Sequence, residues 1–124
     1  MKNLSTNVQK GKYSEHVAFC FLEKAGYDIL ETNWRFGRLE IDIICRKGRF
    51  LVFVEVKSRM DNKLGSPSAA VSSSKKKFLV RAAHKYMEKN KYDGNFRFDI
   101  ITTTGYNNAT LEIEHYQDCF FPGL

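Results

Sequence analysis

Apolar residues in this chain recur in two patterns, one with the spacing of a helix and one typical of β-strands. The helical pattern covers about 11–25, where Gly26 ends it, and about 74–90. Extended β-forming runs separated by turn residues predict strands at about 27–34, 39–46, 50–57, 96–103 and 110–116. In this αβββαββ order the second helix lies between two strands, which predicts a right-handed crossover joining parallel strands. We therefore predict an α/β protein with a mixed central sheet flanked by helices.

The 124 residues are enough for a single domain, 1–124, with its own core. Residues 1–10 are polar and are expected to be frayed or disordered. Residues 58–73 contain Gly65, Pro67 and five serines, which predicts a long, irregular and mobile loop.

Two neighbouring strands carry charged residues within their most apolar runs. Glu40 and Asp42 interrupt the first run, and Glu55 and Lys57 interrupt the second. Desolvating an unpaired charge is costly, so charges in such positions usually serve a bound cation or a reaction. The pattern therefore predicts a metal-dependent site on a β-hairpin.

The relative position of these charges depends on the hairpin turn at Lys47-Gly48-Arg49. Side chains alternate along a strand, so the two charged residues within each pair point to the same side. With Lys47-Gly48 as a two-residue turn, Glu40 lies opposite Glu55, and Asp42 becomes the diagonal neighbour of Glu55. A slip of one residue would put Asp42 and Glu55 on opposite faces. The metal-site hypothesis needs this register, or a bulge that restores it.

Two carboxylates this close repel each other unless a positive charge lies between them. Mg²⁺ takes oxygen ligands, typically one or two carboxylates with water and phosphate oxygens. A lysine such as Lys57 could stabilise an attacking hydroxide beside the cation. The alternative is the solvated outer face of a hairpin, where Glu and Lys often alternate. The apolar residues around these charges instead favour strands that are covered on both faces.

A third acid, Glu15, precedes Ala18, Phe19 and Leu22 at helical spacings of three, four and seven residues. It therefore projects from the apolar side of the first helix and would complete a three-carboxylate cluster if that helix packs on the charged face. The alternative is that Glu15 lies near the helix start and complements the helix dipole.

The net charge of +6 favours a polyanionic partner, nucleic acid before an anionic membrane. No stretch approaches the roughly 20 apolar residues of a membrane span, and the first residues lack the apolar core of a secretory signal. The three cysteines, Cys20, Cys45 and Cys119, are widely spaced, which indicates reduced thiols in a cytoplasm. We expect a cytoplasmic protein that does not enter membranes.

Basic residues near the predicted site are candidates for contacts with a nucleic-acid backbone. Lys75, Lys76 and Lys77 follow three serines at a helix start, which is either a phosphate site or a solvated run of charge. Arg59 follows the Glu55 strand, and Arg38 precedes Asp42. Elsewhere, His115 is predicted to be a satisfied core histidine, and Arg97 and Asp99 are predicted to pair across one strand face.

Short motifs of this chain, taken in order, resemble those of a known family. They are Gly11 to Ala18 with Glu15, Glu40-Ile41-Asp42-Ile43-Ile44, Val54-Glu55-Val56-Lys57-Ser58-Arg59, Gly65 with Ala70-Val71 and Lys75, Arg97-Phe98-Asp99, and Ile113-Glu114-His115 with Phe120. With them the chain resembles the PD-(D/E)xK nuclease superfamily and, more closely, the bacterial YraN family of predicted endonucleases, which are similar to archaeal Holliday junction resolvases. Ser14 and Leu39 stand where that family usually has glycine.

The resemblance implies a restriction-endonuclease-like fold and hydrolysis of phosphodiester bonds in DNA, including branched or Holliday-junction-like DNA. It implies that Asp42, Glu55 and Glu15 bind Mg²⁺ or Mn²⁺, that Val56 adds its backbone carbonyl, and that Lys57 acts near the attacking water. Resolvases act on two strands, so a homodimer is expected. The competing expectation is a non-catalytic nucleic-acid-binding module on the same fold.

Overall fold

Two helices and five strands make up the part of the chain that the structure describes. The structure is a computed structural model, and it describes residues 7–59, 71–105 and 111–120. In chain order the elements are α1 (Asn7–Lys24), β1 (Asp28–Phe36), β2 (Leu39–Lys47), β3 (Phe50–Arg59), α2 (Ser73–Lys89), β4 (Asn95–Thr104) and β5 (Glu112–Phe120). This is the αβββαββ order that the apolar pattern predicts.

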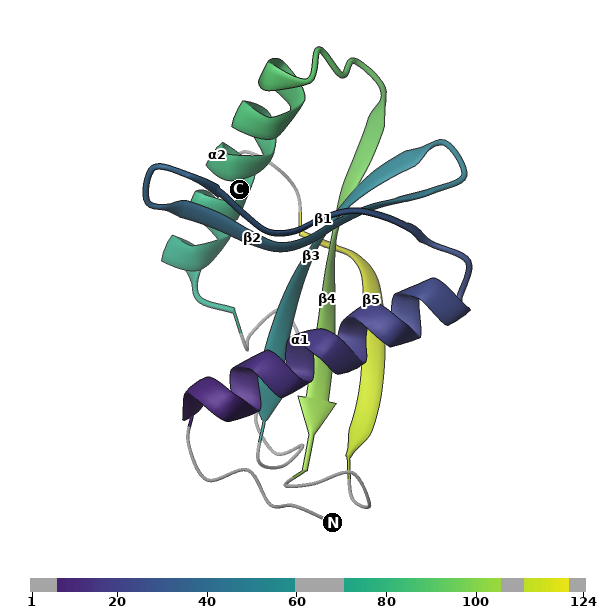
Figure 1. The fold of residues 1–124 in the computed structure, drawn as a ribbon. Coiled ribbons are helices and arrows are strands. Elements are labelled where there is room, and N and C mark those ends of the chain that lie inside the picture. Colours follow the sequence, from purple (N-terminus) through teal and green to yellow (C-terminus); the bar gives the residue numbers. More distant parts are fainter. Residues whose placement is uncertain (1–6, 60–70, 106–110, 121–124) are drawn as a thin grey trace.

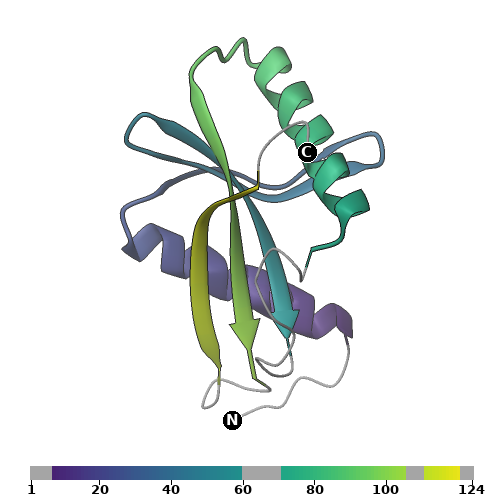
Figure 2. The same cartoon turned by 180° about the vertical axis from the view of Figure 1, so that it is seen from behind.

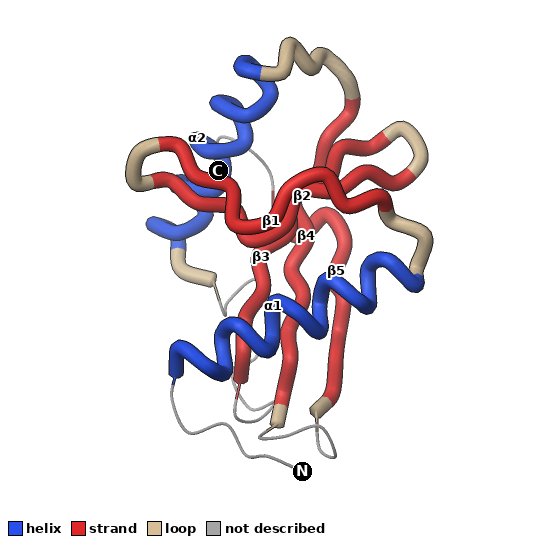
Figure 3. The backbone as a smooth tube through the Cα atoms, in the orientation of Figure 1, coloured by secondary structure: helices blue, strands red, loops and turns tan. Residues whose placement is uncertain are grey.

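The strands form one mixed sheet in the order β1-β2-β3-β4-β5 (Figures 1 and 3). Neighbouring strands are antiparallel except for β3 and β4, which are parallel and are joined through α2. Parallel neighbours need such a crossover because the chain must return to the same end of the sheet. The predicted α/β architecture, with a mixed sheet and two flanking helices, is confirmed.

The helices cover opposite faces of the sheet. In Figure 1 α1 passes in front of β3, β4 and β5, and Figure 2 shows α2 on the other side. The core under α1 contains Ala18, Leu22, Tyr27, Ile43, Cys45, Val52, Val54 and Ile101. The core under α2 contains Leu39, Ile41, Ile44, Leu51, Phe53, Val71, Leu79, Ala82, Ala83, Tyr86, Met87, Phe98 and Ile100. Coverage on both faces explains why β2 and β3 are nearly continuous apolar runs.

The hairpin between β2 and β3 turns at Gly48-Arg49, because Lys47 pairs with Phe50 and Ile43 pairs with Val54. The register predicted from a Lys47-Gly48 turn is therefore wrong by two residues. Gly48 has a φ of 58°, and two-residue hairpin turns favour glycine with positive φ at the first central position. A shift of two residues leaves the face of each side chain unchanged, so the acids of the two strands can still meet.

Several element ends differ from the predicted ones. α1 begins at Asn7, so residues 7–10, which were expected to be frayed, are helical. β3 continues to Arg59, and α2 is capped by Ser72, whose Oγ accepts a hydrogen bond from the Lys75 N–H over 3.1 Å. The predicted loop is shortened at both ends, and its residues 60–70 lie outside the described residues, as do residues 1–6 of the polar start. In the described part of the chain no helix combines the length and apolar character needed to cross a membrane.

Candidate metal-binding site

Asp42 and Glu55 meet where β2 separates from β3. The pairing of the two strands begins at Ile43 and Val54, so Asp42 is the first residue of β2 beyond it. The side chain of Asp42 bonds back to the partner strand, because the Val56 N–H donates to Asp42 Oδ2 over 2.9 Å. This contact places the Asp42 carboxylate beside Glu55, as the metal-site hypothesis requires.

Glu55 is a buried acid whose ionised form would be only partly neutralised by its neighbours. Its side chain is 9% exposed, and Lys75 Nζ lies 3.7 Å from its Oε2. Its other oxygen, Oε1, has no hydrogen-bond partner among the described residues. The pKa of Glu55 is raised from 4.5 to about 9, mainly by burial and then by the charge of Asp42 and a hydrogen bond with Asp42. The charges of Lys75 and Lys57 act in the opposite direction.

The unpartnered Oε1 of Glu55 tests whether the residues fit a divalent cation. Buried polar atoms are nearly always hydrogen-bonded, so an exception indicates a missing ion, a missing water or a function. In the described segments no group of three or more His, Cys, Asp or Glu side chains is arranged to hold a metal ion. Mg²⁺ does not need such a group, because one or two carboxylates with waters and phosphate oxygens suffice. The pair Asp42 and Glu55 fits a cation of that kind and does not fit a closed protein cage.

Glu15 reaches the same region from α1. A pocket of about 300 Å³ is lined by residues of α1, β1 and β2, among them Glu15, Asn33 and Asp42. Asn33 Nδ2 donates to Glu15 Oε1 over 2.6 Å and to Glu40 Oε1 over 3.5 Å. Burial raises the pKa of Glu15, the Asn33 hydrogen bond opposes this, and the charges of Asp42 and Glu40 raise it further. Glu15 is therefore electrostatically coupled to Asp42, and its role as a third ligand stays a prediction.

The alternative for Glu15, a residue that complements the helix dipole, is wrong. α1 begins at Asn7, so Glu15 lies eight residues inside the helix, and the first turn contains no acid. A helix dipole acts mainly within the first and last turns. α1 begins earlier than the apolar pattern predicts because its first residues are polar.

Lys57 and Glu40 flank the acid pair. Lys57 is exposed, follows Glu55 by two residues on β3, and lowers the pKa of Glu55 through its charge. Two-residue spacing in a strand puts both side chains on one side of the sheet. Glu40 is paired with Arg35, with 3.5 Å between Arg35 Nη2 and Glu40 Oε2. Lys57 therefore lies on the same side of β3 as Glu55, its role near an attacking water stays a prediction, and Glu40 lies beside the site, paired with Arg35.

The residues predicted to contact nucleic acid occupy different environments. Arg38 and Lys77 are exposed, and Lys76 is half-buried. Lys75 forms the ion pair with Glu55, so it belongs to the acid site. Arg59 is only 9% exposed because β3 continues through it and pairs it with Thr104. Arg59 is therefore buried, unlike exposed Arg38 and Lys77, and its proposed contact with a DNA backbone stays a prediction.

Two features of the site are not predicted from the sequence: the contacts of Asn33 and the contact of Lys75 with Glu55. Asn33 has a φ of 49° and follows a bulge in β1 between Ile29 and Glu31. Asparagine is rare in strands and enriched at positive φ, so an Asn within a strand pattern was an available signal. Lys75 carried no such signal, because its contact depends on how α2 packs against β3.

Comparison with known proteins places this arrangement in a family. The profile of the family described as Uncharacterised protein family UPF0102 matches residues 14–103. The chain belongs to the UPF0102 family. A UPF0102 protein of Flavobacterium psychrophilum is 44% identical over 111 residues, which cover 90% of this chain and 92% of that protein. Another, from Bacteroides thetaiotaomicron, is 43% identical over 114 residues, covering 92% and 93%. The predicted YraN-like family is confirmed, and the family itself is uncharacterised.

Ser14 and Leu39, at the two positions where the resemblance leads us to expect glycine, both have structural roles in this UPF0102 chain. Ser14 is 3% exposed, and its Oγ lies 2.7 Å from Thr103 Oγ1, a hydrogen bond that joins α1 to β4. Leu39 is 9% exposed and lies in the core under α2. Both larger residues are accommodated within the fold, and neither displaces an acid of the site.

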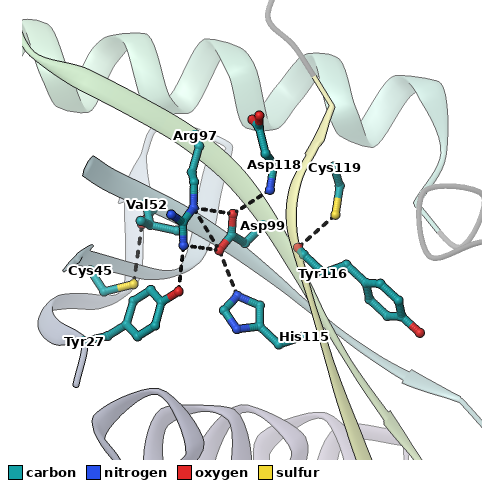
Figure 4. A network of polar contacts seen from close by, with 9 residues as sticks. All are labelled: Tyr27, Cys45, Val52, Arg97, Asp99, His115, Tyr116, Asp118 and Cys119. Atoms are coloured by element: carbon teal, nitrogen blue, oxygen red, sulfur yellow. Dashed lines mark hydrogen bonds and ion pairs between the residues drawn. The ribbon is translucent and has the colours of Figure 1, made fainter. Parts of the chain in front are cut away.

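A second buried acid of the UPF0102 chain, Asp99, is fully partnered (Figure 4). Arg97 donates Nε to Asp99 Oδ1 over 3.0 Å and Nη2 to Oδ2 over 3.2 Å, and the Asp118 N–H donates to Oδ1 over 3.0 Å. His115 Nε2 lies 2.8 Å from Oδ2. Burial by itself would raise the pKa of Asp99, but the hydrogen bonds from His115, Arg97 and Asp118 outweigh burial and lower it. The predictions for Arg97, Asp99 and His115 are confirmed.

Proposed function

We propose that this UPF0102 protein is a metal-dependent endonuclease that hydrolyses phosphodiester bonds in DNA. The observation that carries the proposal is the Oε1 of buried Glu55, which lies beside the Asp42 carboxylate and has no partner among the described residues. Acids that served only packing would be expected to have both oxygens paired, because an unsatisfied buried group destabilises the fold. The order of Asp42, Glu55 and Lys57 in motifs that resemble PD-(D/E)xK nucleases supports the same reaction.

A divalent cation, Mg²⁺ or Mn²⁺, would activate water and stabilise negative charge on the phosphate oxygens. Asp42 and Glu55 would hold that cation, with Glu15 and the Val56 carbonyl as further proposed ligands. Glu55 must lose its proton to do so, because a carboxylate binds metal in its charged form. Lys57 stabilises the attacking hydroxide and the charge that develops in the transition state. Lys75 holds Oε2 of Glu55, which leaves Oε1 for the cation.

The proposed substrate is DNA, because the chain carries a net charge of +6 and a polyanion neutralises such a surface. Exposed Arg38 and Lys77 are proposed to contact its backbone. Branched or Holliday-junction-like DNA and a homodimer with two active sites follow from the resemblance to resolvases. Both belong to the proposal and are tested with it.

A second candidate function is a non-catalytic nucleic-acid-binding module. One observation favours it: Lys75 Nζ lies 3.7 Å from Glu55, so a cation supplied by the protein already opposes the buried charge. In such a module the acids would organise the fold, and no metal would be needed. DNA binding without cleavage is its expected behaviour.

The test is cleavage of a labelled four-way junction and of a linear duplex, each with Mg²⁺, Mn²⁺ or EDTA. We expect cleavage only with metal, loss of cleavage in Asp42→Asn and Glu55→Gln, and a rate about 100-fold lower in Lys57→Ala. Glu23→Gln and Lys89→Ala are matched controls, because both side chains are exposed and lie outside the site. The control variants should cleave like the wild-type protein.

Metal-dependent cleavage that survives both acid substitutions would place the reaction elsewhere on the protein. DNA binding with no cleavage in any metal would support the module instead. Titration of Mn²⁺ by calorimetry separates these cases further, because a binding site lost in Glu55→Gln supports a metal at the acid pair whether or not the tested DNA is cleaved.

A further inference from the structure

A groove with basic and aromatic walls runs between α2 and the turn of the β1–β2 hairpin. Phe36 and Arg38 line it from the hairpin, and Phe78, Arg81 and Lys85 line it from α2. Its volume is about 510 Å³. Figures 1 and 2 view the molecule from opposite sides, and both place the hairpin turn beside α2. The groove is thus a built feature of two elements, separate from the pocket that contains Glu15 and Asp42.

The two aromatic rings of the groove are unusually exposed for large apolar side chains. Phe36 is 42% exposed and Phe78 is 51% exposed. Phe36 is also held in place, because the Trp34 ring stacks on it at 6.3 Å with an interplanar angle of 18° and Lys85 Nζ lies 5.6 Å from its centroid. Fixed and accessible rings beside cations are the platforms on which bases of single-stranded nucleic acids stack.

The charge of the groove matches a nucleic-acid strand. The described residues that line it include Arg38, Arg81 and Lys85, and none of them is Asp or Glu. Phe78, Arg81 and Lys85 recur at helical spacings of three and four, so they share one face of α2. At 1.5 Å per residue they extend over about 10 Å, the length of about three stacked nucleotides at about 3.4 Å each. The groove therefore offers stacking contacts and phosphate contacts over a length that matches about three nucleotides.

We infer that this groove binds single-stranded DNA, with bases stacked on Phe36 and Phe78 and phosphates paired with Arg38 and Arg81. The inference rests on the proposed function, which takes DNA as the substrate. The bases must be unpaired, because a duplex hides their faces. Lys75, one turn before Phe78 on α2, contacts Glu55, so a strand in the groove leads toward the acid pair. The substrate class is thus DNA with a single-stranded segment next to the cleaved bond.

The test is binding of a fluorescent 12-nucleotide oligothymidine, and of a duplex of equal length, measured by anisotropy in EDTA at several salt concentrations. Phe78→Ala should weaken single-strand binding about tenfold with an unchanged salt slope, because it removes stacking. Arg81→Ala should weaken binding and reduce the slope by about 0.7, the value for one phosphate contact on a single strand. Leu30→Ala and Arg49→Ala are matched controls, because both side chains are exposed and lie outside the groove.

The inference is overturned if Phe78→Ala and Arg81→Ala bind the single strand as tightly as the two controls do. It is also overturned if the two variants lose the same amount of affinity for the duplex as for the single strand. The wild-type protein could instead form a dimer that the Phe78→Ala variant does not form, while the variant keeps its affinity for DNA. The groove would then bind a second copy of the chain, and this result also overturns the inference. The assay needs no metal, so its outcome is independent of cleavage. A protein that binds through the groove but never cleaves would refute the nuclease proposal alone.

Discussion

The substitution Glu55→Gln removes the charge of the buried acid and keeps its shape. In the folded protein, burial and the neighbouring Asp42 raise the pKa of Glu55 from 4.5 to about 9. Folded Glu55 therefore keeps its proton at pH values where the unfolded chain has lost it. Between these two values the folded state binds more protons than the unfolded state, so the free energy of unfolding should fall as pH rises.

The size of this effect follows from the pKa shift. One pKa unit corresponds to about 1.4 kcal/mol, so between pH 4.5 and pH 7.5 the wild-type protein should lose about 4 kcal/mol relative to a variant that cannot titrate. Glutamine loses the hydrogen bond that protonated Glu55 makes with Asp42 and leaves amide atoms without partners, which costs about 1–3 kcal/mol. The wild-type protein should therefore be the more stable one at pH 5, and Glu55→Gln the more stable one at pH 7.5.

Urea unfolding in EDTA between pH 5 and pH 8.5, followed by circular dichroism, measures this reversal. Glu23→Gln is the matched control, because its side chain is exposed and its curve should follow the wild-type curve. Mn²⁺ should stabilise the wild-type protein more strongly as pH rises, since the cation competes with the proton of Glu55. Mn²⁺ should leave the free energy of unfolding of Glu55→Gln unchanged.

Two results would refute this reasoning. If the stabilities of the wild-type protein and Glu55→Gln run parallel with pH, Glu55 is not a buried acid with a raised pKa. If Mn²⁺ stabilises both proteins equally, the cation does not bind at Glu55. The first result would undermine the electrostatic description of the site, and the second would undermine only the metal proposal.

Three further predictions test the fold around the site. Asp99→Asn should destabilise the protein by about 3–5 kcal/mol, because Arg97 loses its buried counter-charge; a loss below about 1 kcal/mol in urea at pH 7 would contradict this. Because the pKa of Asp99 is lowered, Asp99 contributes to the free energy of unfolding above pH 3.8, and this contribution should be lost as pH falls below 3.8. Asp99→Asn should not show this loss. Gly48→Ala should cost about 1–2 kcal/mol at its φ of 58° in thermal melting, whereas Gly11→Ala, whose added Cβ meets no atom within 4 Å, should cost nothing; equal melting points would contradict this. Ser14→Ala should cost about 1–3 kcal/mol in urea unfolding by leaving Thr103 unpaired, and adding Thr103→Val should recover part of it; simple additivity would argue against the hydrogen bond.

The element order was predictable from the sequence because each helix and strand follows from its own local pattern. The register of β2 against β3 was not, because it depends on which residue of the turn takes the positive φ, and that residue is Gly48. The error left the site intact, since a shift of two residues preserves faces. What the sequence could predict about the acids was therefore which side of the strand they share, not which residues face each other.

Contacts between distant elements explain the remaining differences. Asn33 donates to Glu15 from a strand position with positive φ, and although an Asn in a strand pattern is unusual, it does not indicate which distant residue the side chain contacts. Lys75 belongs to a run of three lysines, so its sequence neighbours favoured a role in phosphate binding. Its ion pair with Glu55 exists only because the start of α2 packs beside β3. Local patterns contain no information about either packing arrangement.

The two buried acids of this sheet differ in how completely the fold neutralises them. Asp99 receives hydrogen bonds from Arg97, His115 and the Asp118 N–H, and its pKa is lowered. Glu55 has one lysine at 3.7 Å and a hydrogen bond with Asp42 that raises its pKa, and its Oε1 has no partner in the described part of the chain. A fold able to satisfy one buried carboxylate so fully leaves the other incomplete, and local inconsistencies of this kind concentrate at functional sites. This contrast assigns Asp99 to stability and supports Glu55 as the centre of the proposed metal site.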